Sequence, residues 1–147
     1  MRLLLYGDSL TAGYHSNGLR FSPWAPALRA LLGVEAVDAG GHSGWTSSEM
    51  RAAMDEEAAD VCGLKKPGMR LAMRTQGPFD AVVILAGTND LASEGSPEQI
   101  SGSIQLLHAA ARAEGARTVA MAIPESLAAR HVPALAATRA VANERLA

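Results

Sequence analysis

Short, continuous apolar runs separated by helix-forming segments limit most strongly what this 147-residue chain can fold into. Four such runs are Leu3–Tyr6, Val34–Val37, Ala81–Leu85 and Thr118–Ile123. An unbroken apolar run, unlike an alternating one, is typical of a parallel strand that is buried on both faces. Strands of this kind that alternate with helices predict a parallel sheet covered on both sides by helices.

The segments between the runs carry start and stop signals of helices. Ser22-Pro23 combines a hydroxyl N-cap with a proline at the first helical position, and Gly33 is suited to close that helix. Thr46 and Glu49 have the spacing of a capping box, and we expect the helix that they open to continue to about Gly63.

The second half of the chain shows the same signals. Ser96-Pro97-Glu98-Gln99 opens a helix with a capping box, and Gly115 ends it. The apolar face of this helix consists of Ile100, Ile104, Leu107 and Ala111. Further helices are expected at Pro67–Gln76 and from Pro133 onward.

Right-handed crossovers between the four strands predict a doubly wound, three-layer α/β/α sandwich with a flavodoxin-like parallel sheet. The first run would lie between the second and the third, and the fourth would form an edge. A chain of this length is one domain by size, and 48% hydrophobic and 19% charged residues are ordinary for a globular domain. An exposed edge strand invites pairing with another chain, so we expect a tendency to self-associate.

Charge and cysteine content exclude several classes of function. The net charge is −2 and the bases form no stripe, which argues against a nucleic-acid partner; the pair Lys65-Lys66 is too short to be a binding patch. The single cysteine, Cys62, makes no internal disulfide, and we interpret it as a small buried residue at the end of an Ala-rich helix. The N-terminal apolar run is too short for a signal peptide and no stretch approaches a membrane span, so we expect a cytoplasmic protein.

Three polar, glycine-bearing turns follow three of the predicted strands and therefore meet at one edge of the sheet. They are Gly7-Asp8-Ser9-Leu10, Ser43-Gly44-Trp45-Thr46 and Gly87-Thr88-Asn89-Asp90. A serine hydroxyl can attack a carbonyl, and backbone and amide N–H groups can hold the oxyanion that forms. We interpret Asp8 and Asp90 as structural residues that accept from backbone N–H groups of their own turns. Trp45 suits a pocket wall and a packing role equally.

The three turns, in this order, resemble the sequence blocks of the SGNH (GDSL) family of serine esterases and lipases. The resemblance implies an SGNH hydrolase-like fold and cleavage of small-molecule carboxylic esters through an acyl-enzyme, without a cofactor or a metal. It assigns Ser9 as the nucleophile, and Ser9, Gly44 and Asn89 as the three oxyanion donors.

The chain departs from the family pattern at its C-terminal end. The family supplies its general base from an Asp-x-x-His block after a fifth strand, and no such block occurs here. We therefore expect residues 1–147 to be one SGNH-type domain, incomplete at the C-terminus and lacking the last strand. His42, beside the second turn, is the nearest substitute base. The other histidines are His15, His131 and His108, the last a mid-helix residue that we expect at the surface of the protein or at the boundary of its core. None is assigned as catalytic.

Two alternatives remain open at this point. The first is a catalytically inactive fragment or binding module of the same fold, because the base is missing. The second is a flavodoxin-like phosphate or nucleotide binder that uses the glycine-bearing turn around Ser9. This second alternative lacks a P-loop, a G-x-G-x-x-G pattern and a basic residue in the turn, and it leaves the block at Asn89 unexplained. No spacing of His, Asp or Glu suggests a metal site.

Overall fold

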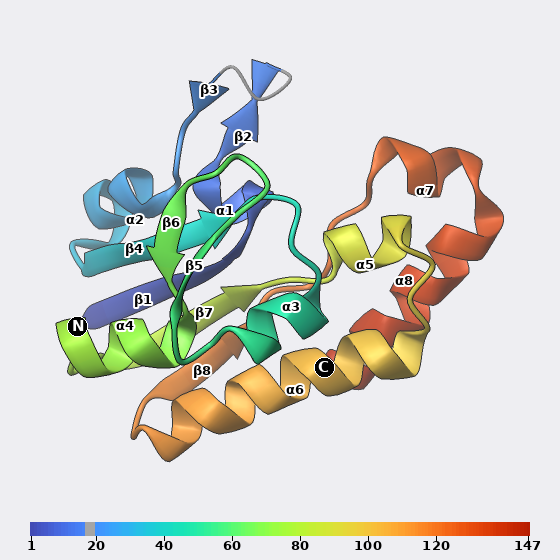
Figure 1. Cartoon of the computed structure of the whole chain (residues 1–147). Helices are drawn as coiled ribbons and strands as arrows, with labels where there is room; N and C mark the ends of the chain where they lie inside the picture. The colour runs from blue at the N-terminus through green and yellow to red at the C-terminus, as the bar shows by residue number, and fades with distance from the viewer. Residues whose placement is uncertain (17–19) are drawn as a thin grey trace.

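The central element is a parallel sheet of four strands in the order β4-β1-β7-β8 (Figure 1). The computed structural model describes residues 1–16 and 20–147, and of residues 37–39 it describes the backbone alone. The strands are β1 (Arg2–Asp8), β4 (Glu35–His42), β7 (Ala81–Leu85) and β8 (Arg117–Ala120). Each neighbouring pair is parallel, which confirms the order expected from the four apolar runs.

Helices cover both faces of this sheet (Figure 1). The longer helices are α2 (Ala25–Leu32) on one face, and α3 (Ser47–Ala52), α4 (Met69–Gln76), α6 (Pro97–Ala113) and α8 (Pro133–Leu146) on the other. Three short helices are α1 (Ser9–Ala12), α5 (Thr88–Ala92) and α7 (Leu127–His131). The predicted three-layer α/β/α sandwich is therefore confirmed.

The two faces of the sheet are buried to different extents. On the α6 side, Leu4, Tyr6 and Ile84 are at most 1% exposed and belong to the larger core. On the α2 side, a smaller core continues into an open apolar groove of about 570 Å³ between α2 and β8. Val119, at the edge of that groove, is 50% exposed. One face of the sheet is thus less completely covered than continuous apolar strands predict.

The helix predicted from Thr46 to about Gly63 is wrong beyond Ala52. Its capping box forms as expected, since Thr46 and Glu49 bond reciprocally. The chain then enters an antiparallel hairpin of β5 (Glu57–Ala59) and β6 (Lys65–Pro67). The carboxylate of Asp60 accepts backbone N–H groups at the hairpin tip, which gives this backbone an alternative to helical hydrogen bonds.

Other predicted boundaries shift by a few residues. Helix α2 begins at Ala25 with Trp24 as its N-cap, so the predicted cap at Ser22 is wrong; the hydroxyl of Ser22 lies 3.1 Å from Nε2 of His15 instead. Gly33 closes the helix with φ 62° as predicted. A second small hairpin, β2 (Tyr14–His15) with β3 (Arg20–Phe21), precedes α2. In the described part of the chain, no helix is long and apolar enough to cross a membrane.

Candidate functional site

One pocket of about 480 Å³ brings together three residues that the sequence singled out, Ser9, Gly44 and Asn89. They follow β1, β4 and β7, so the pocket lies at the carboxyl ends of the three neighbouring strands. Its remaining lining residues are Tyr14, Ser43, Val61 and Cys62. Ligands of parallel α/β folds bind at this edge of the sheet.

Ser9 is the first residue of α1, directly after β1. Oδ1 of Asp8 caps this short helix by accepting the N–H of Leu10 at 2.9 Å. The N–H of Ser9 lies in the first turn, where no helical carbonyl is in reach, and no protein acceptor is found for it among the described residues. A Cβ atom at Gly7 would lie 2.4 Å from the carbonyl oxygen of Leu85, so the end of β1 approaches β7 this closely only with glycine.

Gly44 occupies a turn with φ +78°, a conformation that favours glycine. A Cβ atom here would lie 2.6 Å from Cγ1 of Val61, so the side chain of Val61 fills the space beside the glycine. Among the residues that the structure describes, no protein group accepts the N–H of Gly44. This amide is therefore available to a ligand in the pocket.

Asn89 lies in the first turn of α5 and connects the third polar turn to the second. Its Nδ2 donates to the carbonyl oxygen of Trp45 at 2.8 Å, which leaves its second amide hydrogen for a ligand. The neighbouring Asp90 is 6% exposed and accepts the backbone N–H of Ser47 at 2.8 Å and its hydroxyl at 2.6 Å. Asp90 is structural, as expected, but it bonds to the N-terminus of α3 and not to its own turn.

Asp8 fits the structural role expected of it. Its carboxyl is fully buried, and burial raises its pKa to about 6, although the N–H groups of Leu10 and Thr88 act in the opposite direction. It accepts from Leu10 within its own turn and does not line the pocket.

Trp45 and His42 pack into the interior. Their rings stack with centroids 4.3 Å apart, and Nε2 of His42 lies 3.3 Å from the carbonyl oxygen of Pro67. His42 is 0% exposed, and burial lowers the pKa of its imidazole. The structure therefore supports the packing role of Trp45, and neither ring lines the pocket of Ser9.

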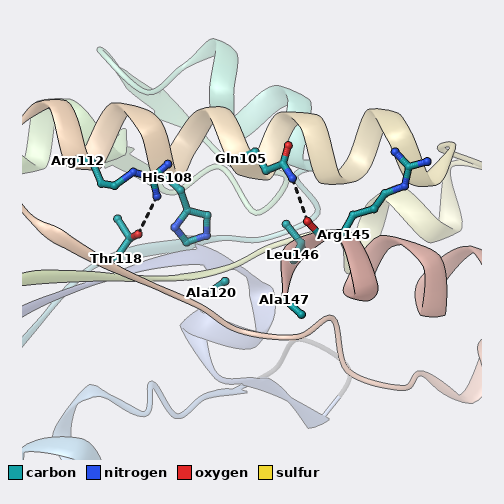
Figure 2. A pocket seen from close by; sticks show the side chains of 8 residues that line it. All are labelled: Gln105, His108, Arg112, Thr118, Ala120, Arg145, Leu146 and Ala147. Atoms are coloured by element: carbon teal, nitrogen blue, oxygen red, sulfur yellow. Dashed lines mark hydrogen bonds between the residues drawn. The ribbon is translucent and has the colours of Figure 1, made fainter.

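None of the other three histidines is a lining residue of the Ser9 pocket. His15 is exposed and bonds to Ser16 and Ser22, and His131 is exposed at the end of α7. His108 is 6% exposed, which corrects its expected surface position. Figure 2 shows it in a separate pocket, beside the bond from Arg112 to Thr118, and that pocket shares no lining residue with the Ser9 pocket.

Neither the hairpin tip nor Tyr14 was predicted from the sequence to be part of the site. Cys62, expected to be buried, is exposed at this tip and lines the Ser9 pocket together with Val61. A turn signal was present: Gly63, which adopts φ +75°, follows Asp60 at a short distance, and Pro67 follows soon after. The Ala-rich stretch before this segment favoured the prediction of a helix over that of a turn.

Known proteins share both sequence features and the fold of this chain. The family model of the GDSL-like lipase/acylhydrolase family matches residues 5–147. The chain belongs to the GDSL-like lipase/acylhydrolase family. Membership and fold place it among hydrolases of the esterase and lipase type. No curated protein matches the sequence.

Solved structures of GDSL-type proteins superpose on nearly the whole chain. A G-D-S-L family protein from Desulfitobacterium hafniense has a TM-score of 0.69 at 20% identity, over 97% of this chain and 67% of its own. TesA has a TM-score of 0.68 at 25% identity, over 99% and 75%. The psychrotrophic esterase EstA from Pseudoalteromonas sp., inhibited by monoethylphosphonate, has a TM-score of 0.66 at 18% identity, over 98% and 70%. At these identities the likeness establishes the fold.

Proposed function

We propose that this protein is a serine hydrolase that cleaves carboxylic esters through an acyl-enzyme on Ser9, and that residues 1–147 form one SGNH-type domain. The observation that carries the proposal is the common pocket of Ser9, Gly44 and Asn89. A hydroxyl nucleophile and three N–H donors lining one pocket supply the attacking group and the oxyanion donors of acyl transfer.

The proposed reaction has two steps. Oγ of Ser9 attacks the ester carbonyl, and the negative charge that develops on the carbonyl oxygen is held by the N–H groups of Ser9 and Gly44 and by Nδ2 of Asn89. The ester C–O bond then breaks, the proton given up by Oγ of Ser9 passes to the leaving alcohol oxygen, and an acyl-enzyme remains on Ser9. Water hydrolyses this acyl ester, which releases the carboxylic acid and restores the hydroxyl of Ser9. The fixed backbone around Gly44 and the bond from Asn89 to Trp45 keep two donors oriented before the substrate binds.

A second candidate function is binding of esters without turnover. It is favoured by one observation: among the residues that the structure describes, no histidine, lysine or carboxylate lines the Ser9 pocket. A serine hydroxyl without a base is a weak nucleophile. This candidate keeps the same pocket and the same three donors.

Labelling with a fluorophosphonate probe distinguishes the two candidates. For a hydrolase we expect labelling of the chain and turnover of p-nitrophenyl acetate, both abolished by Ser9→Ala. Ser22→Ala serves as the matched control, because Ser22 lies outside the pocket. A folded chain that binds esters but shows no Ser9-dependent labelling would reject hydrolysis and support the binding module.

We also propose that two copies of the chain associate through the edge of β8. Arg117 and Met121 direct their N–H groups to β7, so Thr118 and Ala120 direct theirs outward. An unpaired edge beside the exposed Val119 and the apolar groove is a surface that pairs with another strand.

Sedimentation velocity tests this association. We expect a concentration-dependent dimer that Val119→Lys shifts to monomer, because the introduced charge opposes strand pairing. Leu106→Lys is the control, since Leu106 is 51% exposed on α6 and does not line the apolar groove at β8. A monomer at all concentrations would contradict the proposal.

A further inference from the structure

The tip of the β5–β6 hairpin, residues 60–64, contributes a wall of the Ser9 pocket although it lies outside the central sheet. Val61 and Cys62 line the pocket from this tip. Val61 is 74% exposed and has its methyl groups beside Gly44. An apolar side chain that borders the proposed oxyanion donor and is not covered by protein is placed to contact a substrate.

A buried carboxylate holds this tip against the polar turn at Gly44. Oδ1 of Asp60 accepts the N–H of Cys62 at 2.9 Å and that of Leu64 at 3.1 Å, and Oδ2 accepts the N–H of Ser43 at 3.1 Å. Nζ of Lys66 lies 3.6 Å from the same carboxylate. The N–H of Val61 donates back to the carbonyl oxygen of Ser43 at 3.2 Å, so the tip and the turn are joined in both directions.

The β2–β3 hairpin supplies a further apolar group to the same pocket. Tyr14 of β2 lines it, and its ring packs edge to face on Phe21 with centroids 5.9 Å apart. Figure 1 shows the β2–β3 pair beyond the end of the sheet where α1 lies, and the tip of the β5–β6 hairpin near α1. The pocket volume of about 480 Å³ falls in the range of sites that enclose a ligand much larger than an acetyl ester.

From these contacts we infer that the two hairpins form the substrate-binding walls of the Ser9 pocket, that Val61, Cys62 and Tyr14 select esters with an apolar chain of several carbons over acetyl esters, and that Asp60 is the positioning residue of this wall. The inference rests on the proposed ester site and names its substrate class. Within the described part of the chain, no charged side chain lines the pocket. An apolar chain that binds there therefore does not strip water from a charged group.

Protection of Cys62 from alkylation measures substrate binding without chemistry. Cys62 is the single cysteine of the chain and is exposed, so N-ethylmaleimide reports on this position alone. The full chain carrying Ser9→Ala keeps the ester intact during the measurement. We expect methyl octanoate to slow alkylation at concentrations roughly tenfold or more below those needed with methyl acetate, because each methylene buried against the walls strengthens binding by about fourfold.

A matched pair of variants at the same tip tests the wall itself. Val61→Ser is expected to raise the methyl octanoate concentration for half-protection by about fivefold. Leu64→Ser is expected to leave it unchanged, because the exposed Leu64 side chain does not line the pocket. Equal protection by the two esters, no protection by either, or equal effects of the two variants would overturn the inference.

The outcomes separate this inference from the proposed function. Chain-length-dependent protection, together with an absence of Ser9-dependent labelling in the unmodified chain, would retain the hairpin walls and reject hydrolysis. Ser9-dependent labelling without protection of Cys62 would retain hydrolysis and overturn the hairpin walls.

Discussion

Two regions of the molecule meet at the Ser9 pocket and are held in place by different means. The strand-end turns are fixed by close backbone approaches at glycines such as Gly7, and by the buried bonds of Asp90 to α3. In the part of the chain that the structure describes, the hairpin does not pair with a strand of the central sheet, and its tip is held chiefly by the carboxylate of Asp60.

This difference separates two tasks within one pocket. The turns present the nucleophile and the donors, whose positions must be accurate for transition-state stabilisation. The hairpin tip presents side chains to the remainder of the substrate. Their positions need less accuracy, so the single carboxylate of Asp60 is sufficient to hold the tip in place. Changes in the turns should therefore affect the rate of reaction at Ser9, whereas changes in the hairpin should affect which ester binds.

The largest expected effect comes from a donor in the turns. Asn89→Ala removes both the proposed oxyanion donor and the bond to Trp45, and we expect the rate of fluorophosphonate labelling to fall by about 10²–10³-fold. Methyl octanoate should still protect Cys62, because the hairpin walls are unchanged. If Asn89→Ala abolished both the labelling of Ser9 and the protection of Cys62, the two regions would not act separately.

Gly44 is the point at which the two regions touch, and Gly44→Ala should reduce labelling by about tenfold or more. Two causes contribute: the strain of a side chain at φ +78°, and the contact of the new Cβ with Val61. Adding Val61→Ala removes the second cause alone. Partial recovery of the labelling rate in the double variant would show that the hairpin pushes on the donor, and no recovery would assign the whole effect to backbone strain.

Asp60→Asn should weaken the hairpin without removing the chemistry. The amide keeps one acceptor but introduces N–H hydrogens toward backbone N–H groups, so the tip loses its anchor. We expect the methyl octanoate concentration for half-protection to rise about fivefold, with a smaller change in labelling by a short fluorophosphonate. Asp55→Asn is the control, since Asp55 is an exposed carboxylate paired with Arg70. A larger loss in labelling than in protection would contradict the separation of tasks.

The sequence predicted the region whose signals are local. The apolar runs defined the four strands and their order, and each glycine-bearing turn follows directly from its strand, so the grouping of Ser9, Gly44 and Asn89 followed from topology. The hairpin tip depends on contacts between residues far apart along the chain, such as Asp60 with Ser43. The alanines before the tip favour a helix locally, and the contacts with distant residues stabilise a hairpin instead.

The same contrast applies to Asp8 and Asp60, two buried carboxylates that should respond to pH in opposite directions. Burial raises the pKa of Asp8 from its ordinary value of 3.8 to about 6. Burial also acts to raise the pKa of Asp60, but three backbone N–H groups and Lys66 outweigh it and hold that pKa below its ordinary value. Folding therefore favours the protonated form of Asp8 and the charged form of Asp60.

The free energy of unfolding should follow these shifts. The Asp8 carboxyl makes folding less favourable as pH rises from about 4 to about 6, by roughly 2–3 kcal/mol in total. The Asp60 carboxylate stabilises the folded state at neutral pH, and this stabilisation disappears as pH falls through the lowered pKa of Asp60.

Urea unfolding at several pH values tests both effects. Asp8→Asn should be more stable than the unmodified chain at about pH 8, with a difference that shrinks toward about pH 4. Asp60→Asn should be less stable at about pH 8, with a deficit that shrinks only under more acidic conditions. If the free energy of unfolding of the two variants changed with pH in the same way, the turns and the hairpin tip would be held by the same kind of interaction.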